Sequence, residues 1–340
     1  MDIKSFFREN IRNLAPYSTA RDEYQGDIGI YLDANENPYD NGYNRYPDPH
    51  QKELKALLSK IKGVPAENIF IGNGSDEPID LVFRVFCEPR IHNAVSIAPT
   101  YGMYKVAAGT NDVEFREVLL NEDFRLDSGK VLSAADENTR LIFLCSPNNP
   151  SGNLLDMGEV EKIVTGFNGI VVLDEAYIDF ADSESMTCEL KKYPNLVVLQ
   201  TLSKAWGLAG LRLGLAFAGE EIIAVMSRIK YPYNINVVTQ EIVKKELARP
   251  REKDIAEIKR ERAMVERELV KLPVVKKVYP SDSNFVLVKV DDPRGLYETL
   301  INEGVIVRDR SRIKGCEGCL RITVGTPEEN RKMLEILKKQ

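Results

Sequence analysis

Short apolar runs recur along the first two thirds of the chain, and most of them end in a polar loop containing glycine, proline or asparagine. Apolar runs of about four to eight residues bounded by turn signals are typical of buried strands. The pattern predicts strands at 68–71, 94–97, 141–145, 169–173, 196–199 and 213–218. Helical spacing of apolar residues predicts helices between them, for example at 51–61 and 79–86. This alternation indicates an α/β fold whose largely parallel sheet is covered by helices on both faces.

The pattern changes after Pro250. Apolar residues there are spaced along a charge-rich background, which predicts a long amphipathic helix. Further elements follow at 284–290, 296–301, 304–307 and 320–324, with a last helix from Pro327. We therefore expect a large α/β domain over residues 42–245. We expect a smaller α+β domain from residues 246–340, grouped with the N-terminal segment 1–41.

Composition narrows the class of partner. The 340 residues carry a formal net charge of −6 without a lysine- or arginine-rich block, which argues against nucleic acid or an anionic membrane as the main partner. The N-terminus is too charged for a signal peptide, and no apolar run approaches membrane-spanning length. The five cysteines are odd in number and mostly scattered, which favours a reduced, cytoplasmic setting.

Cys316 and Cys319 form a C-x-x-C pair, a spacing found in metal and redox sites. A structural zinc ion needs four ligands. No second pair exists, and the only histidines, His50 and His92, are far away in the sequence. We expect no metal.

The segment 72–78 follows a predicted strand and opens a predicted helix. A glycine-rich turn at a helix start is an anion site, because free backbone N–H groups and the positive helix end face one point. The turn begins like a dinucleotide fingerprint, but Glu77 stands where the third glycine belongs. A site for a single phosphate is favoured, and a purely structural turn is the alternative.

Two further loops carry groups suited to one kind of cofactor. Lys204 follows the run 196–199, and a desolvated lysine amine can attack a carbonyl. Asp174 directly follows another strand, and Tyr177 comes three residues later. An aspartate there can keep a pyridine nitrogen protonated, and Ser203 and Arg212 can hold a phosphate. These are the requirements of pyridoxal phosphate, although any one of these residues taken alone is also compatible with an ordinary surface position.

The order of these motifs resembles the fold-type-I aminotransferases, and within them the histidinol-phosphate aminotransferase family. The resemblance covers almost the whole chain. It rests on ENIRNLAPY (9–17), DANENP (33–38), NRYPDP (44–49), GNGSDE (72–77), PTYGMY (99–104), SPNNPSG (146–152), LDEAYIDF (173–180), TLSKAWGLAGLRLG (201–214), VIVRDR (305–310) and CLRITVGTPEEN (319–330).

The resemblance implies a role for each matching residue. Lys204 would bond to the cofactor aldehyde and move the substrate proton, Asp174 would pair with the ring nitrogen, and Tyr177 would bond the ring oxygen. The other implied cofactor residues are Asn149 at the ring oxygen, Tyr101 stacked on the ring, Ser203, Arg212 and the N–H groups of Ser75 and Asp76 at the phosphate, and Tyr46 from a partner subunit. A homodimer with shared sites is therefore implied.

The resemblance also implies the substrates. Arg321 is similar to the arginine that clamps an α-carboxylate, Tyr17 and Arg308 match positions that take a substrate phosphate, and Asn149 lies beside the substrate. The implied reaction moves an amino group between histidinol phosphate and 2-oxoglutarate in histidine biosynthesis. The alternatives of the same fold are a phosphothreonine decarboxylase and an aromatic amino-acid aminotransferase. A regulator with an aminotransferase-like effector domain is a third, but it would need a fused DNA-binding domain.

Overall fold

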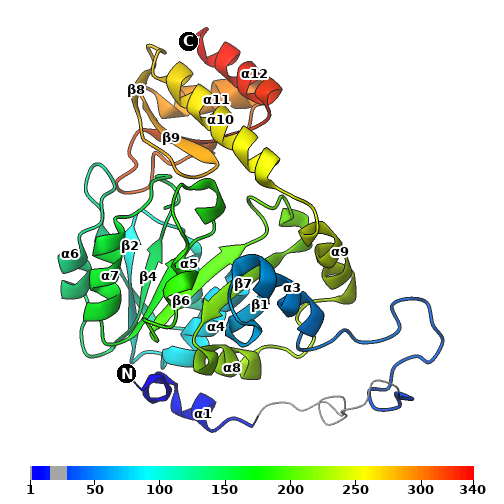
Figure 1. Ribbon diagram of the computed structural model, residues 1–340. Helices are drawn as coiled ribbons and strands as arrows, with labels where there is room; N and C mark the ends of the chain where they lie inside the picture. Colours follow the sequence, from blue (N-terminus) through cyan, green and yellow to red (C-terminus); the bar gives the residue numbers. More distant parts are fainter. Residues whose placement is uncertain (1, 16–28) are drawn as a thin grey trace.

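The computed structural model describes residues 2–15 and 29–340, and its strands form two separate sheets (Figure 1). The large sheet has seven strands in the order β1-β7-β6-β5-β4-β2-β3. Its strands are β1 (Ile69–Asn73), β2 (Asn93–Ala98), β3 (Glu114–Leu119), β4 (Thr139–Cys145), β5 (Ile170–Asp174), β6 (Leu196–Thr201) and β7 (Leu213–Ala218). All six strands expected from the apolar runs are present.

The large sheet is parallel except for one strand. Strands β2 to β6 pair in parallel, whereas β7 runs antiparallel to both of its neighbours, β6 and β1. The strand β3 has no counterpart among the apolar runs. It lies at the sheet edge, and its side chains are half-buried or exposed. An edge strand of this kind needs no continuous apolar run.

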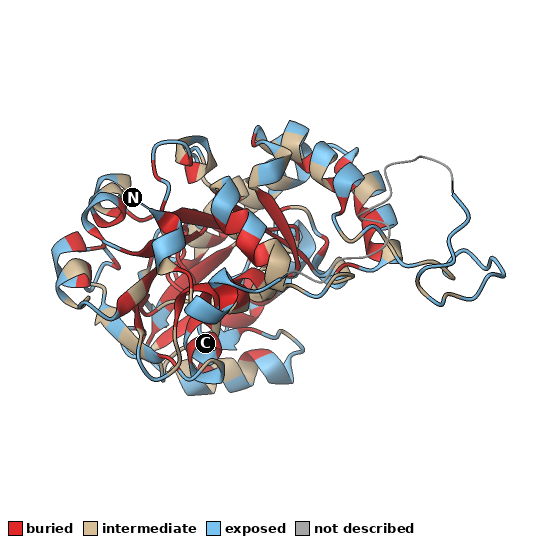
Figure 2. Ribbon diagram, turned by 90° about the horizontal axis from the view of Figure 1, so that it is seen from below, coloured by how far each residue is buried: buried red, intermediate tan, exposed pale blue. Residues whose placement is uncertain are grey.

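Both faces of the large sheet are covered, as expected. Alternate strand residues enter different cores: Ile142 and Leu144 lie in one, and Leu141 and Phe143 lie in the other. The first core is closed by α3 (Lys52–Lys62), α6 (Ser128–Ser133), α7 (Met157–Gly166) and α9 (Val237–Leu247). The second is closed by α4 (Asp76–Phe86), α5 (Met103–Thr110) and α8 (Glu220–Ile229). Figure 2 shows the buried strands between these helices.

The N-terminal residues pack on the large-sheet unit. The short helices η1 (Ile3–Phe6) and α1 (Glu9–Arg12) place Ile3, Phe7 and Ile11 in the core that contains α4 and α8. Residues 29–50 form an arm that loops away from the body (Figure 1) and returns to it where Tyr46 stacks on Tyr233. We therefore propose that residues 2–15 belong to the large unit, while the division of the chain near residues 42 and 245 stays a prediction.

The smaller sheet is antiparallel, in the order β10-β11-β9-β8. Its elements are α10 (Glu252–Leu269), β8 (Val275–Val278), β9 (Phe285–Val290), α11 (Pro293–Asn302), β10 (Arg308–Asp309), β11 (Cys319–Thr323) and α12 (Pro327–Leu337). The three helices pack on one face through residues such as Val286, Val288 and Ile322. Leu287, on the opposite face, packs with Phe124 of the large unit. The second face therefore meets the large unit.

One strand of the smaller sheet differs from the expectation. The element expected at 304–307, a strand closed by Arg308, lies later in the chain, because pairing with β11 begins only at Arg308. Gly304 takes a positive φ of 77° just after α11, and residues 305–307 lead into the sheet without joining it. Short helical turns complete the chain: η2 (Ala66–Asn68), η3 (Ile178–Phe180), η4 (Met186–Glu189) and η5 (Ala209–Leu211).

Within residues 2–15 and 29–340, no helix combines the length and apolar character needed to cross a membrane. The same residues bring together no group of three or more His, Cys, Asp or Glu side chains that could hold a metal ion. Cys316 and Cys319 are buried with Phe124, Tyr279 and Leu287 at the contact between the two units.

Candidate active site

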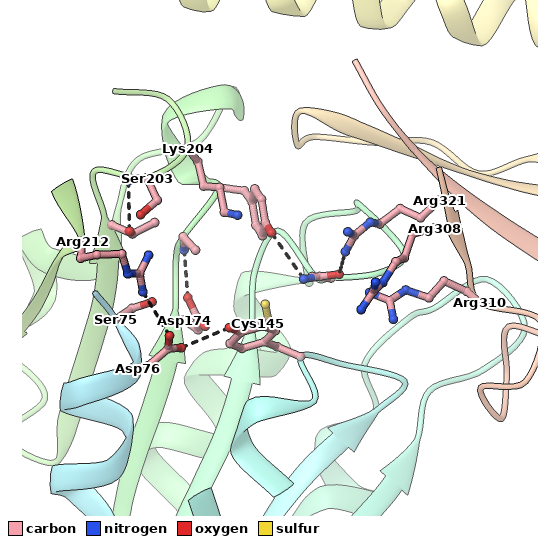
Figure 3. Close-up of a pocket in the computed structure, with 15 residues that line it drawn as sticks. Ser75, Asp76, Cys145, Asp174, Ser203, Lys204, Arg212, Arg308, Arg310 and Arg321 are labelled. Atoms are coloured by element: carbon pink, nitrogen blue, oxygen red, sulfur yellow. Dashed lines mark hydrogen bonds and ion pairs between the residues drawn. The ribbon is translucent and has the colours of Figure 1, made fainter. Parts of the chain in front are cut away.

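A cavity of about 380 Å³ lies between the two sheets, at the carboxyl edge of the large one (Figure 3). Most of the residues that the sequence singled out line it. The lining consists of Ser75, Asp76, Tyr101, Cys145, Asn149, Asp174, Ala176, Tyr177, Thr201, Ser203, Lys204 and Arg212 from the large unit, and Arg308, Arg310 and Arg321 from the small one.

Sheet topology explains why distant loops meet at this cavity. Parallel strands have their carboxyl ends at one edge, and ligands bind at that edge of open α/β sheets. Asp174 ends β5, and Lys204 follows β6. Arg212 precedes β7, but because β7 is antiparallel, its amino end lies at the same edge. One reversed strand therefore adds an arginine to a row of carboxyl-end loops.

Asp174 is buried beneath the cavity and held by two donors. The Tyr104 hydroxyl donates to Oδ2 at 2.6 Å, and the Ala176 N–H donates to Oδ1 at 3.0 Å. Burial raises the pKa of Asp174, and the two hydrogen bonds oppose that rise. A carboxylate that is desolvated but already oriented can pair strongly with a cationic ligand group.

Lys204 lines the cavity, and its side chain is exposed to solvent. Burial lowers the pKa of its amine, the positive charge of Arg321 lowers it further, and Asp174 opposes these effects. Its Nζ lies 5.6 Å from the centroid of the Tyr177 ring. The environment favours the neutral, nucleophilic amine more than water does.

The turn between β1 and α4 provides the predicted anion site. The first N–H groups of a helix have no intrahelical acceptor, and α4 starts without a side-chain cap at Ser75. The Arg212 guanidinium lies against this turn: a Cβ added at Gly74 would be 2.4 Å from its Nη2. A Cβ at Gly214 would lie 2.1 Å from the backbone nitrogen of Ser75. Glycines at these two positions allow strand, turn and guanidinium to form one cradle.

Acidic and aromatic groups orient this cradle. Arg212 Nη2 lies 3.3 Å from Asp76 Oδ2, and the Tyr101 hydroxyl donates to Asp76 Oδ1 at 3.1 Å. Ser203 lines the cavity beside them, with its backbone N–H donating to Thr201 Oγ1 at 3.1 Å. Together these groups can hold one phosphate next to the lysine.

Asn149 connects the two halves of the cavity. Its amide Nδ2 donates to the Tyr177 hydroxyl at 3.4 Å, and its Oδ1 accepts from Arg321 Nη1 at 2.5 Å. The Tyr177 ring meets Phe285 of the small sheet edge-on, with centroids 5.2 Å apart. Arg321 lies over the same Phe285 ring at 5.1 Å. The small unit therefore contacts the large unit directly at the cavity.

Two predicted site residues lie elsewhere. Tyr17 falls outside the described residues. Tyr46 lies on the arm of residues 29–50, where its ring stacks on Tyr233 with centroids 4.4 Å apart, and it does not line this cavity. Its predicted contribution to a partner's site stays a prediction.

The structure adds residues that the motif comparison overlooked. Arg310 lines the cavity, and Tyr104 holds Asp174. Both carry a signal within quoted motifs: Arg310 comes two residues after Arg308, the spacing of one face of extended backbone, and Tyr104 comes three residues after Tyr101, at the start of α5. Cys145, Ala176 and Thr201 also line the cavity.

Residues 30–337 match the family described as aminotransferase class I and II. The chain is 54% identical over 339 residues to the histidinol-phosphate aminotransferase of Parabacteroides distasonis, covering 99% of this chain and 98% of that protein. The structure of the Clostridium acetobutylicum histidinol-phosphate aminotransferase is similar with a TM-score of 0.79 at 25% identity, covering 87% of this chain and 90% of that one.

A further solved structure, the Sinorhizobium meliloti histidinol-phosphate aminotransferase in complex with pyridoxal 5′-phosphate, has a TM-score of 0.77 at 24% identity and covers 87% and 82% of the two chains. These similarities confirm the fold-type-I prediction. With a match over most of its length and a relative at 54% identity, the chain belongs to the class I and II aminotransferases, and within them to the histidinol-phosphate aminotransferase family.

Proposed function

We propose that this protein uses pyridoxal phosphate to transfer an amino group between histidinol phosphate and 2-oxoglutarate, as a step of histidine biosynthesis. The observation that carries the proposal is one cavity with a lysine at its centre, a phosphate cradle on one side and three arginines on the other. The names of the full-length relatives support the same substrate.

The residues fit the cofactor in size and charge. The cradle formed by Gly74, Ser75 and Arg212 is suited to a phosphate, and Ser203 lines the cavity beside it. Asp174 provides a buried carboxylate for a pyridine N–H, and Tyr177 with Asn149 provides donors for a ring oxygen. When bound, pyridoxal phosphate supplies an aldehyde and a protonated ring that accepts electrons from the substrate carbon.

Lys204 would act twice. With its pKa lowered by burial and by Arg321, its Nζ can attack the cofactor aldehyde as a neutral amine. As a free amine, the same Nζ would hold and move a proton between the substrate α-carbon and the cofactor carbon. Asp174, oriented by the Tyr104 hydroxyl, would accept a hydrogen bond from the protonated ring nitrogen of the bound cofactor.

The arginines would bind the far end of both substrates. Arg321 can clamp a carboxylate with its planar fork, and Arg308 lies opposite it on the neighbouring strand. Histidinol phosphate presents a phosphate and 2-oxoglutarate presents carboxylates, so one cationic region can serve both. Asn149 is hydrogen-bonded to both Arg321 and Tyr177. It would therefore fix the position of the bound anion relative to the cofactor ring.

We further propose a cytoplasmic homodimer with shared active sites. Support comes from the arm of residues 29–50, part of which loops away from the rest of the chain (Figure 1). Glu36 orders this arm by accepting from Arg45 Nη1 at 2.7 Å and from the Tyr46 N–H at 2.7 Å. Tyr46 would then reach the phosphate cradle of the partner subunit.

The half-reaction spectrum tests the substrate. With histidinol phosphate, we expect the absorbance of the cofactor to convert to that of pyridoxamine phosphate. With phosphothreonine, we expect no such conversion. Release of carbon dioxide from phosphothreonine, without reaction of histidinol phosphate, would instead assign the protein to the decarboxylases of this fold.

The variant Lys204→Ala tests the chemistry. Loss of Nζ removes both nucleophile and proton carrier, so we expect turnover to fall by at least about 10⁴-fold, in line with removal of an acid–base group and a nucleophile. Cofactor bound through the cradle alone should remain detectable by absorbance. Activity equal to that of the parent protein would refute the proposed role of Lys204.

A further inference from the structure

Three arginines share one face of the small sheet at the cavity. Arg308 on β10 lies directly opposite Arg321 on β11 in the antiparallel register. Arg310 follows Arg308 by two residues, and its N–H donates to the Cys319 carbonyl at 3.0 Å, which continues the pairing. Residues two apart on a strand point to the same face. All three line the cavity, and Figure 3 draws their side chains together on one side of it.

This cluster has no acidic partner among residues 2–15 and 29–340. Those residues form no ion pair with any of the three guanidinium groups, and the Nε atoms of Arg310 and Arg321 are buried without a hydrogen-bond partner. Like charges directly opposite each other on two strands destabilise a sheet. Burial lowers the pKa of Arg310, and the charges of Arg321 and Arg308 lower it further. The arrangement is therefore unfavourable until an anion enters.

The cluster suits an anion whose charge is concentrated on one group. A phosphate ester carries a charge of about −1.5 to −2 on one group at neutral pH, with three acceptor oxygens. A carboxylate carries one charge and accepts one bidentate fork. Arg321, already bonded to Asn149, is sufficient for a carboxylate. The second carboxylate of a dicarboxylate can be taken by Arg308, so the third guanidinium group, that of Arg310, is needed only for the further oxygens of a phosphate.

We propose that Arg310 is a specificity-determining residue that contacts the phosphate of the phosphate-ester substrate and contributes little to the binding of the dicarboxylate. This inference rests on the proposed function, because it assigns a residue to one of the two substrates. It predicts that the two half-reactions of one enzyme depend differently on one side chain.

The test compares Arg310→Gln with Arg312→Gln in the pyridoxal-phosphate-loaded enzyme. Arg312 is exposed and absent from the cavity lining, so the control removes the same charge two residues away. A charge-assisted hydrogen bond corresponds to about a 10- to 100-fold change. We expect that loss in kcat/KM with histidinol phosphate for Arg310→Gln, a loss below about threefold with glutamate, and no change for Arg312→Gln.

A binding measurement provides a readout independent of turnover. Inorganic phosphate should raise the melting temperature of the loaded parent protein and of Arg312→Gln, and should raise that of Arg310→Gln much less. If Arg310→Gln does not retain cofactor, Arg310→Lys replaces it: the charge remains but the fork is lost, and a smaller loss confined to histidinol phosphate is expected.

Equal losses with both substrates, or an unchanged reaction with histidinol phosphate, would overturn the inference. A parent enzyme that reacts with glutamate but not with histidinol phosphate would refute the proposed function instead. In that case the phosphate-dependent melting temperatures still decide whether Arg310 binds a phosphate group.

Discussion

The two sides of the cavity differ in how their charges are balanced. On the large-sheet side, Asp174 and Arg212 already have protein partners: Asp174 accepts from Tyr104, and Arg212 lies against Asp76. On the small-sheet side, Arg308, Arg310 and Arg321 have no acidic partner among the described residues. These two charges on the large-sheet side therefore have partners before a ligand binds, whereas the three guanidinium charges on the small-sheet side have no acidic partner among the described residues.

This difference matches two kinds of ligand. A group that stays bound through many turnovers is best held by oriented, satisfied donors, because no reorganisation is then needed during reaction. A substrate that enters and leaves gains binding energy from charges that nothing else neutralises. The comparison therefore suggests that the large sheet holds the cofactor and that the small sheet selects the substrate.

The largest effect is expected from a substitution at Gly214, on the large-sheet side of the cavity. In Gly214→Ala the new Cβ would lie 2.1 Å from the Ser75 nitrogen and 2.3 Å from the Gly74 carbonyl carbon, both backbone atoms. Overpacking should cost about 3 kcal/mol or more, and cofactor affinity should fall by about 100-fold. Absorbance titration with pyridoxal phosphate measures the affinity.

Gly219→Ala is the matched control for that substitution. Gly219 has a φ of −56°, and an added Cβ would have only the Pro194 carbonyl oxygen near it, at 3.9 Å. We expect unchanged cofactor binding in this variant. If both alanine variants bind cofactor like the parent, the cradle does not depend on close packing at Gly214.

The second-largest effect is expected in the pH dependence of stability, through the buried Glu175, which follows Asp174 in the sequence. Burial raises its pKa to about 7, against donors from Ser185, the Met186 N–H and Gln200. A folded pKa above the unfolded value of 4.5 means that the folded state binds the extra proton. The contribution of Glu175 to stability should then be fully present below about pH 4.5 and be lost by about pH 7, a decline on the order of 3 kcal/mol.

Glu175→Gln should remove that decline, because an amide does not titrate in this range. Urea unfolding at several pH values between about 4.5 and 8 measures the difference between variant and parent. Parallel curves for the two proteins would contradict a raised pKa at Glu175.

The smallest effect is expected from Tyr104→Phe. The ring stays packed on Phe143, with centroids 4.9 Å apart in the parent, but the hydroxyl that donates to Asp174 is lost. Asp174 then ionises less readily, so its pairing with a protonated ring nitrogen weakens. We expect kcat to fall by about tenfold, the equivalent of about 1.4 kcal/mol, and the melting temperature to fall as well, because a buried hydrogen bond to a carboxylate is lost. An unaltered kcat would show that Asp174 needs no second donor.

Much of the cavity lining can be predicted from short stretches of the sequence. Asp174 and Lys204 each follow a run of apolar residues, and parallel strands bring the ends of such runs to one edge. The glycine turn before α4 likewise carries its own signature. These features depend on residues next to one another in the chain, so spacing alone predicts them.

Other features arise only from pairing between distant segments. Nothing near Arg212 in the sequence indicates that β7 is antiparallel, yet this reversal places the arginine at the cavity. The strand expected at 304–307 lies later in the chain for the same reason, because the pairing with β11 begins at Arg308. That register also sets Arg308 against Arg321 and adds Arg310. The sequence by itself determined the lysine chemistry and the fold class, because these depend on local patterns; the cluster of three arginines was decided by tertiary structure, because strand register depends on contacts between segments far apart in the chain.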